Sequence, residues 1–142
     1  MLEIEGLEYT LDAQIGFLLR KALQRNSEIF YKNMFPELTP TRFAAMVKIY
    51  EMGALSQNDL GRRTAMDVAT IKGVVERLMK LGLVKISKDP TDGRKHLIQL
   101  TTSGNKMIKK ATETGLLVSK KTLEPLSTSQ KRTLTSLLGK IC

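Results

Sequence analysis

Arg94 lies in a run of turn-forming residues, DPTDGR at 89–94, in a chain of 142 residues. A guanidinium on an exposed turn can bind a phosphate or enter the narrow minor groove of duplex DNA. Earlier in the chain, Thr70 and Lys72 can donate hydrogen bonds to base edges, and Gly73 leaves room for a close approach of the backbone. These residue types favour binding to DNA over catalysis.

Two helices are predicted to position the candidate base contacts. Ser56 followed by Asp59 fits a Ser-x-x-acid capping pattern, in which both side chains satisfy backbone donors at a helix start. After a short polar turn, Asp67 is a good N-cap for a second helix, and Gly82 can end that helix in the left-handed conformation. Apolar residues in the second helix recur at spacings of three and four, as on one helix face. They are Ile71, Val74, Val75, Leu78, Met79 and Leu81.

A β-hairpin is predicted to present Arg94. Residues 84–88 and 96–100 alternate apolar with polar side chains, and the run between them has proline, aspartate and glycine where a turn requires them. Helix, turn, helix and hairpin in this order form a winged helix-turn-helix. We therefore expect a mainly α fold with a small β-hairpin wing.

Three segments within residues 38–104 resemble the multiple-antibiotic-resistance regulator (MarR) family. They read LTPTRFAAMVKIYEMG, SQNDLGRRTAMDVATIKGVVERLMKLGLV and DPTDGRKHLIQLTTSG. The resemblance implies that the second helix enters the major groove. It also implies that Arg94 enters the minor groove, steadied by Asp92. Wings of the family often carry a further arginine where this chain has Gly93, so minor-groove affinity would depend on Arg94 with Lys95 and His96.

The candidate DNA contacts come from the second helix, the start of the first and the wing. Arg77 is expected to bind phosphate, whereas Val68 is explained equally well by packing and by contact with a thymine methyl. The full set is Ser56, Gln57, Val68, Ala69, Thr70, Lys72, Gly73, Arg77, Asp92, Arg94 and Lys95.

Amphipathic helices are predicted at both ends of the chain. Apolar residues from Asp12 to Phe35 keep a period near 3.6, in a helix too long to bury on so small a body. After the hairpin, a long helix begins near Thr102, and a capping box of Ser127 with Gln130 starts the last helix. Such ends predict a dimer, because a two-fold dimer matches a pseudo-palindromic DNA site, and the resemblance implies the same. The prediction is one domain, residues 1–142, with a winged helix-turn-helix core at 38–101 and dimerisation helices at 9–36 and 102–142.

The net charge of +9 is concentrated in the second half of the sequence. Residues 1–55 sum to −1, residues 56–100 to +4 and residues 101–142 to +6. A basic chain with few aromatic residues fits a binder of duplex DNA better than a binder of single strands, which needs stacking platforms.

Other chemistry has little support in the sequence. His96 is the single histidine and Cys142 the single cysteine, and neither metal-ligand spacings nor glycine-rich phosphate loops occur. We therefore predict no metal, no cofactor and no enzymatic activity, and we interpret Cys142 as a mobile terminal thiol. No apolar run is long enough to cross a bilayer, which predicts no membrane partner and a cytoplasmic protein.

A stripe on the first long helix is a candidate effector site. In the family that the chain resembles, small molecules, often phenols or aromatic carboxylates, bind between the dimer helices and the winged helix. Arg20, beside apolar walls, could bind a carboxylate in two-pronged fashion, although it could equally pair with a surface acid or lie in solvent. The candidate stripe is Gly16, Arg20, Gln24, Ser27 and Tyr31, with Arg42 and Phe43 as the opposite wall.

The main hypothesis is a homodimeric repressor that binds a pseudo-palindromic operator in double-stranded DNA and is released by a small aromatic or phenolic ligand. The alternative is an architectural protein that binds DNA without reading its sequence. A winged helix that binds another protein is a third option, against which the basic side chains of Lys72 and Arg94 argue.

Overall fold

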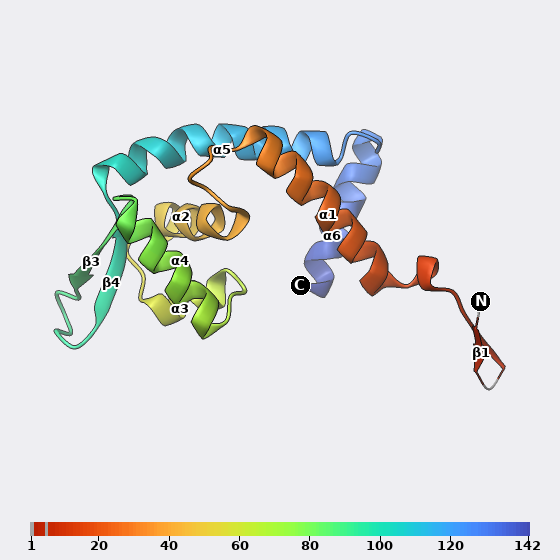
Figure 1. Ribbon diagram of the computed structural model, residues 1–142, viewed down its shortest axis with the longest axis horizontal. Helices are drawn as coiled ribbons and strands as arrows, with labels where there is room; N and C mark the ends of the chain where they lie inside the picture. The colour runs from red at the N-terminus through yellow and green to blue at the C-terminus, as the bar shows by residue number, and fades with distance from the viewer. Residues whose placement is uncertain (1, 5) are drawn as a thin grey trace. The chain divides into compact units, whose positions relative to one another are not determined.

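The computed structural model describes residues 2–4 and 6–142, which divide into two compact units. The winged-helix unit comprises residues 33–116. The end-helix unit comprises the described residues of 1–32 together with residues 117–142. Figure 1 shows the elements of both units and labels their helices. The prediction of a single domain with a core at 38–101 stays a prediction.

Three helices form the body of the winged-helix unit. They are α2 (Pro40–Met52), α3 (Gln57–Arg63) and α4 (Val68–Lys80). Each begins at a residue whose side-chain oxygen accepts a hydrogen bond from a backbone amide three residues on: Thr39, Ser56 or Asp67. The caps predicted at Ser56 and Asp67 are thus confirmed. After α4, Gly82 has a φ of +71°, the left-handed conformation predicted to end that helix.

Four of the six residues in the predicted stripe of α4 are buried, whereas Leu81 is half-buried and lies just after the helix. Ile71 and Leu78 are almost fully buried, as is Leu60 of α3, and α2, α3 and α4 all contact one another. Met79 was also expected in the stripe, but 41% of it is exposed. Because successive residues of a helix are about 100° apart, Met79 lies a quarter turn away from the face that Leu78 shares with Ile71.

The predicted wing is confirmed as an antiparallel hairpin of β3 (Val84–Lys88) and β4 (His96–Leu100). Val84 pairs with Leu100 at its base, and Lys88 pairs with His96 next to the turn. At its middle, Ile98 exchanges two backbone hydrogen bonds with Leu55, in the link between α2 and α3. The hairpin is therefore joined to the helices by backbone bonds as well as by packing.

α5 (Thr102–Thr122) starts directly after the wing and approaches its neighbours closely. The Thr101 hydroxyl donates to the Gly82 carbonyl, 2.6 Å away, and accepts from the Gly104 amide. A Cβ at Gly104 would collide with the Leu83 carbonyl oxygen. A Cβ at Gly115 would lie 2.8 Å from the ring of Phe43 on α2, so a larger residue there would have to displace this ring.

The end-helix unit contains α1 (Ile15–Asn33) up to Lys32, the last turns of α5, and α6 (Thr128–Ile141). The Arg25 guanidinium donates to the carbonyls of Lys121 and Thr122, and the Asn26 amide donates to the Thr122 hydroxyl. These bonds satisfy carbonyls at the C-terminal end of α5 and join it to α1. The predicted capping box at Ser127 is present, with bonds in both directions to Gln130.

The start of the chain differs from the prediction. A hairpin of β1 (Leu2–Ile4) and β2 (Leu7–Tyr9) precedes a 3-10 turn, η1 (Leu11–Ala13). α1 therefore begins at Ile15, later than the predicted start at Asp12. Asp12 lies in the short 3-10 turn instead, where the Ala13 and Gln14 amides bond three residues back.

Candidate nucleic-acid interface

α4 has one buried face and one open face. Ile71, Val74, Val75 and Leu78 anchor it in the unit, and the positions between them are exposed. Val68 is 71% exposed, which does not support its packed alternative. A Cβ at Gly73 would meet nothing within 4 Å, so this part of the open face is bare backbone. The predicted base and phosphate contacts that share the open face are Val68, Ala69, Thr70, Lys72, Gly73 and Arg77.

Glu76 also lies on the open face of α4, although the sequence analysis did not count it among the DNA contacts. Its carboxylate repels DNA phosphates and can only accept hydrogen bonds. In the major groove, the donor that aspartate and glutamate typically bind is the cytosine amino group. Its spacing of seven from Ala69 and three from Gly73 places it off the apolar stripe, as the sequence predicts.

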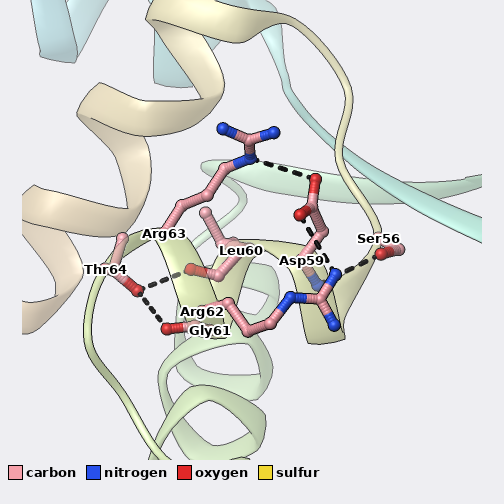
Figure 2. Close-up of polar contacts among 7 residues, drawn as sticks. All are labelled: Ser56, Asp59, Leu60, Gly61, Arg62, Arg63 and Thr64. Carbon is pink, nitrogen blue, oxygen red and sulfur yellow. Dashed lines mark hydrogen bonds and ion pairs between the residues drawn. The ribbon is translucent and has the colours of Figure 1, made fainter.

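α3 carries a charged cluster, drawn in Figure 2. The Asp59 carboxylate lies 3.1 Å from Nε of Arg63 and 3.2 Å from Nη2 of Arg62. Hydrogen bonds from Arg63, and less strongly from Arg62, hold the pKa of Asp59 below its ordinary 3.8. The Thr64 hydroxyl donates to the Leu60 carbonyl and so covers the end of the helix.

Only half of the capping pattern predicted for α3 is therefore present. The Ser56 hydroxyl accepts from the Asp59 amide, but the Asp59 carboxylate bonds to the two arginines. The aspartate side chain is one methylene shorter than glutamate, and arginines three and four residues later on the same face compete for it. That spacing is visible in the sequence and could have predicted the cluster.

Asp67 is the N-cap of α4, and its carboxylate accepts a hydrogen bond from the first turn of that helix. Hydrogen bonds from the side chain and the backbone amide of Thr70 lower the pKa of Asp67. Asp67 therefore keeps a negative charge at the helix N-terminus, where the helix dipole favours it. Thr70, a predicted base contact, is also part of this cap.

The wing turn is held by two aspartates. Asp89 accepts from the amide and the hydroxyl of Thr91, bonds that lower its pKa. Asp92 is half-buried and accepts from the backbone amide of Arg94, 3.1 Å away. This hydrogen bond to Asp92 fixes the Arg94 backbone, and the Arg94 side chain is exposed at the turn together with Lys95.

All the candidate DNA contacts lie in the winged-helix unit, on three of its elements. Ser56 and Gln57, at the start of α3, are half-buried, and the Ser56 hydroxyl is occupied as a cap. The α4 contacts and the basic residues of the wing are exposed. The structure thus combines a helix whose open face is small and mildly basic with an exposed arginine on a hairpin, the two features needed to reach both grooves.

The candidate effector residues fall in both units. The stripe on α1 belongs to the end-helix unit, where Gly16, Arg20, Gln24 and Tyr31 are exposed and Ser27 is half-buried. Among the described side chains, Arg20 enters no ion pair, so its pairing with a surface acid is not seen. In the winged-helix unit, the Arg42 guanidinium donates to the Glu37 carbonyl, and the Phe43 ring lies against Gly115. The effector site stays a prediction.

Within residues 2–4 and 6–142, no group of three or more histidine, cysteine, aspartate or glutamate side chains is placed to hold a metal ion. In the same part of the chain, no helix combines the length and the apolar character that crossing a bilayer demands.

Comparison with known proteins identifies the family. The MarR family model matches residues 38–96, from the end of the α1–α2 link into β4. The HTH-type transcriptional repressor NicR of Pseudomonas putida is 41% identical over 106 residues, covering 74% of this chain and 67% of NicR. The chain belongs to the MarR family.

Solved structures of two other proteins extend the match over nearly the whole chain. A probable transcriptional regulator from Pseudomonas aeruginosa has a TM-score of 0.90 and 45% identity, covering 94% of this chain and all of its own. BpsR of Bordetella bronchiseptica, whose DNA binding is regulated by 6-hydroxynicotinic acid, has a TM-score of 0.89 and 33% identity, covering 95% and 97%. The mainly helical MarR fold with its small wing is thereby confirmed.

Proposed function

We propose that this protein is a homodimeric transcriptional repressor that binds a pseudo-palindromic operator in double-stranded DNA and releases it when a small aromatic acid binds. The observation that carries this proposal is the open face of α4, supported from behind by a buried stripe and accompanied by the exposed Arg94 of the wing. The 41% sequence identity with the repressor NicR supports repression rather than activation.

The DNA contacts follow from this surface. We assign Ala69, Thr70, Lys72 and Gly73 to base edges in the major groove and Arg77 to phosphate. Arg94 enters the minor groove, where its guanidinium meets a negative potential that a narrow groove strengthens. The Asp92 bond to the Arg94 amide fixes the turn from which the side chain extends.

The dimer is proposed from the apolar side chains of the end-helix unit. Exposed leucines and isoleucines lie on α1 and α6, including Ile15, Leu23, Leu137 and Ile141. Covering such side chains is favourable in water, and a two-fold partner covers both copies at once. A dimer also doubles the number of DNA contacts and matches the two halves of a palindrome.

The proposed effector is a hydroxylated aromatic or pyridine carboxylate. BpsR responds to 6-hydroxynicotinic acid, and the exposed Arg20 on α1 is a side chain that can bind such a carboxylate through two parallel hydrogen bonds. We propose no catalytic activity, in line with relatives that are transcriptional regulators. Because the proposed partner is genomic DNA, we propose a cytoplasmic location.

The deciding experiment measures DNA affinity against competing random duplex. A duplex selected from a random pool should bind at least about 10³-fold more tightly than mixed-sequence DNA at moderate salt. Arg94→Ala should weaken this binding severely without changing the melting temperature, and 6-hydroxynicotinic acid should release the wild-type complex. Equal affinity for all sequences would favour the architectural alternative, and full affinity of Arg94→Ala would remove the wing from the interface.

A further inference from the structure

Arg62 lies where α3 meets the beginning of α4. An open groove of about 420 Å³ runs between the two helices, and its lining includes Arg62, Asn58 and Gly61 of α3 and Asp67, Val68 and Ile71 of α4 and its cap. Val68 is strongly exposed and lies at the first turn of the helix proposed to enter the major groove. A DNA strand that contacts this first turn therefore lies next to the groove between α3 and α4, and so close to Arg62.

The charges of the cluster on α3 do not cancel. One carboxylate, Asp59, bonds to two guanidiniums, Arg62 and Arg63, through different oxygens. Because both arginines are always protonated and the lowered pKa keeps Asp59 ionised, the cluster carries one excess positive charge. One guanidinium is therefore available to an external anion.

Exposure and position distinguish the two arginines. The Arg62 side chain is 74% exposed, against 43% for Arg63, and Arg63 is not among the residues that line the groove. In Figure 2 the two side chains reach Asp59 from different sides. An exposed ion pair adds little stability, so exchanging Asp59 for a phosphate costs Arg62 little.

We propose that Arg62 is a further contact to the DNA backbone, and that on binding it leaves Asp59 for a phosphate while Arg63 stays on Asp59. This inference rests on the proposed function, because it requires α4 to enter a groove of DNA. A phosphate contact carries no sequence information, so Arg62 would strengthen binding to every sequence alike and set the register of α4.

The test compares Arg62→Ala with the matched control Arg63→Ala, which removes the other arginine from the same carboxylate. Fluorescence anisotropy gives the affinity for a labelled duplex selected from a random pool and for a mixed-sequence duplex, across a range of salt concentrations. Each phosphate contact adds about 0.9 to the slope of log affinity against log salt. A dimer has two copies of Arg62, so Arg62→Ala should lower the slope by about 1.8 and weaken both duplexes at least about tenfold at low salt.

Arg63→Ala should leave the slope unchanged, and Arg62→Lys should restore most of it, because a lysine also binds phosphate as a point charge. Thermal melting of each variant checks that it is folded. An unchanged slope in Arg62→Ala, or an equal loss in Arg63→Ala, would overturn the inference while leaving the proposed function in place. Failure of the wild-type protein to bind any selected duplex would instead overturn the proposed function.

Discussion

The two units of the molecule differ in how far their apolar side chains are buried. In the winged-helix unit, Leu60 and Leu78 are completely buried and Ile71 nearly so. In the end-helix unit, Leu23 is 64% exposed, and among the described apolar residues of this unit only Phe30 and Val118 are buried. Both units have equally regular helices, so the difference lies in packing and not in helix formation.

This difference shows that amphipathic helices alone do not make a core. The winged-helix unit brings three helices and a hairpin together, so each apolar stripe finds a neighbour in the same unit. In the end-helix unit, hydrogen bonds from Arg25 and Asn26 to Thr122 join α1 to the end of α5, but most of the apolar side chains stay exposed. We propose that a second copy of the chain covers its apolar stripes, and the predictions for Leu60 and Leu23 below test this division.

The largest expected effect is a loss in the free energy of unfolding when a core side chain of the winged-helix unit is truncated. Leu60→Ala should lower it by about 2–5 kcal/mol, because a fully buried leucine leaves a cavity. Urea unfolding monitored by circular dichroism measures this loss, which should not depend on protein concentration.

Leu23→Ala is the matched change in the other unit. Its loss of stability should grow with protein concentration, since coverage of Leu23 by a partner follows mass action. If Leu23→Ala lowered the free energy of unfolding as much as Leu60→Ala does, and did so at every protein concentration, the division between the units would be contradicted.

A charge on the exposed stripe of α1 should have the next largest effect. Leu23→Asp should convert the dimer to a monomer, because a carboxylate cannot be buried without a partner charge. The monomer binds only one half of an operator, so its operator affinity should fall by about 10² or more.

Sedimentation and fluorescence anisotropy measure these two losses. Met52→Asp is the control, because it places the same charge on an exposed apolar residue of the winged-helix unit. If this control dissociated the dimer and Leu23→Asp did not, the interface would have to be moved to the other unit.

Most of the winged-helix unit could be predicted from the sequence because its signals are local. Caps at Ser56 and Asp67, the spacing of apolar residues in α4 and the alternation of the wing strands each depend on a few neighbouring residues. The open face of α4 follows directly from its buried one. The sequence analysis missed what depends on competition between side chains, such as Asp59 bonding to arginines instead of completing its cap.

The beginning of the chain was missed for a different reason. β1 and β2 are three residues each, too short for alternation to be visible, and the hairpin turns at Gly6, whose φ is +79°. That glycine was the available signal. The closeness of α5 to α2 at Gly115 could not be predicted either, because a helical glycine does not indicate which side chain will occupy its space.

A smaller effect is expected on the open face of α4, where stability and binding should change in opposite directions. Gly73→Ala should stabilise the fold by about 0.5–1 kcal/mol, because alanine favours the helix interior and a Cβ there meets nothing. The same methyl should weaken operator binding, because it stands between the backbone and the bases.

Thermal melting and anisotropy measure the two changes in one variant. Gly61→Ala is the control on the buried side, where a Cβ would lie 3.1 Å from Ile71 Cγ2 and 3.2 Å from the Met66 carbonyl oxygen, so its stability should rise less than that of Gly73→Ala. An operator affinity unchanged by Gly73→Ala would show that α4 does not approach the bases closely.

The smallest expected effect is a loss of stability in acid that originates in the winged-helix unit. Asp59, Asp67 and Asp89 lie there, and hydrogen bonds lower the pKa of each below its ordinary 3.8. A carboxyl whose pKa is lower in the folded state stabilises the fold above its unfolded pKa, and this contribution disappears as the pH falls through the lower, folded value. The free energy of unfolding should therefore fall below about pH 3.8. Asp67→Asn keeps a side-chain cap but cannot titrate, so urea unfolding at a series of pH values should show a shallower acid loss in this variant, and an equally steep loss would mean that the Asp67 cap does not contribute to it.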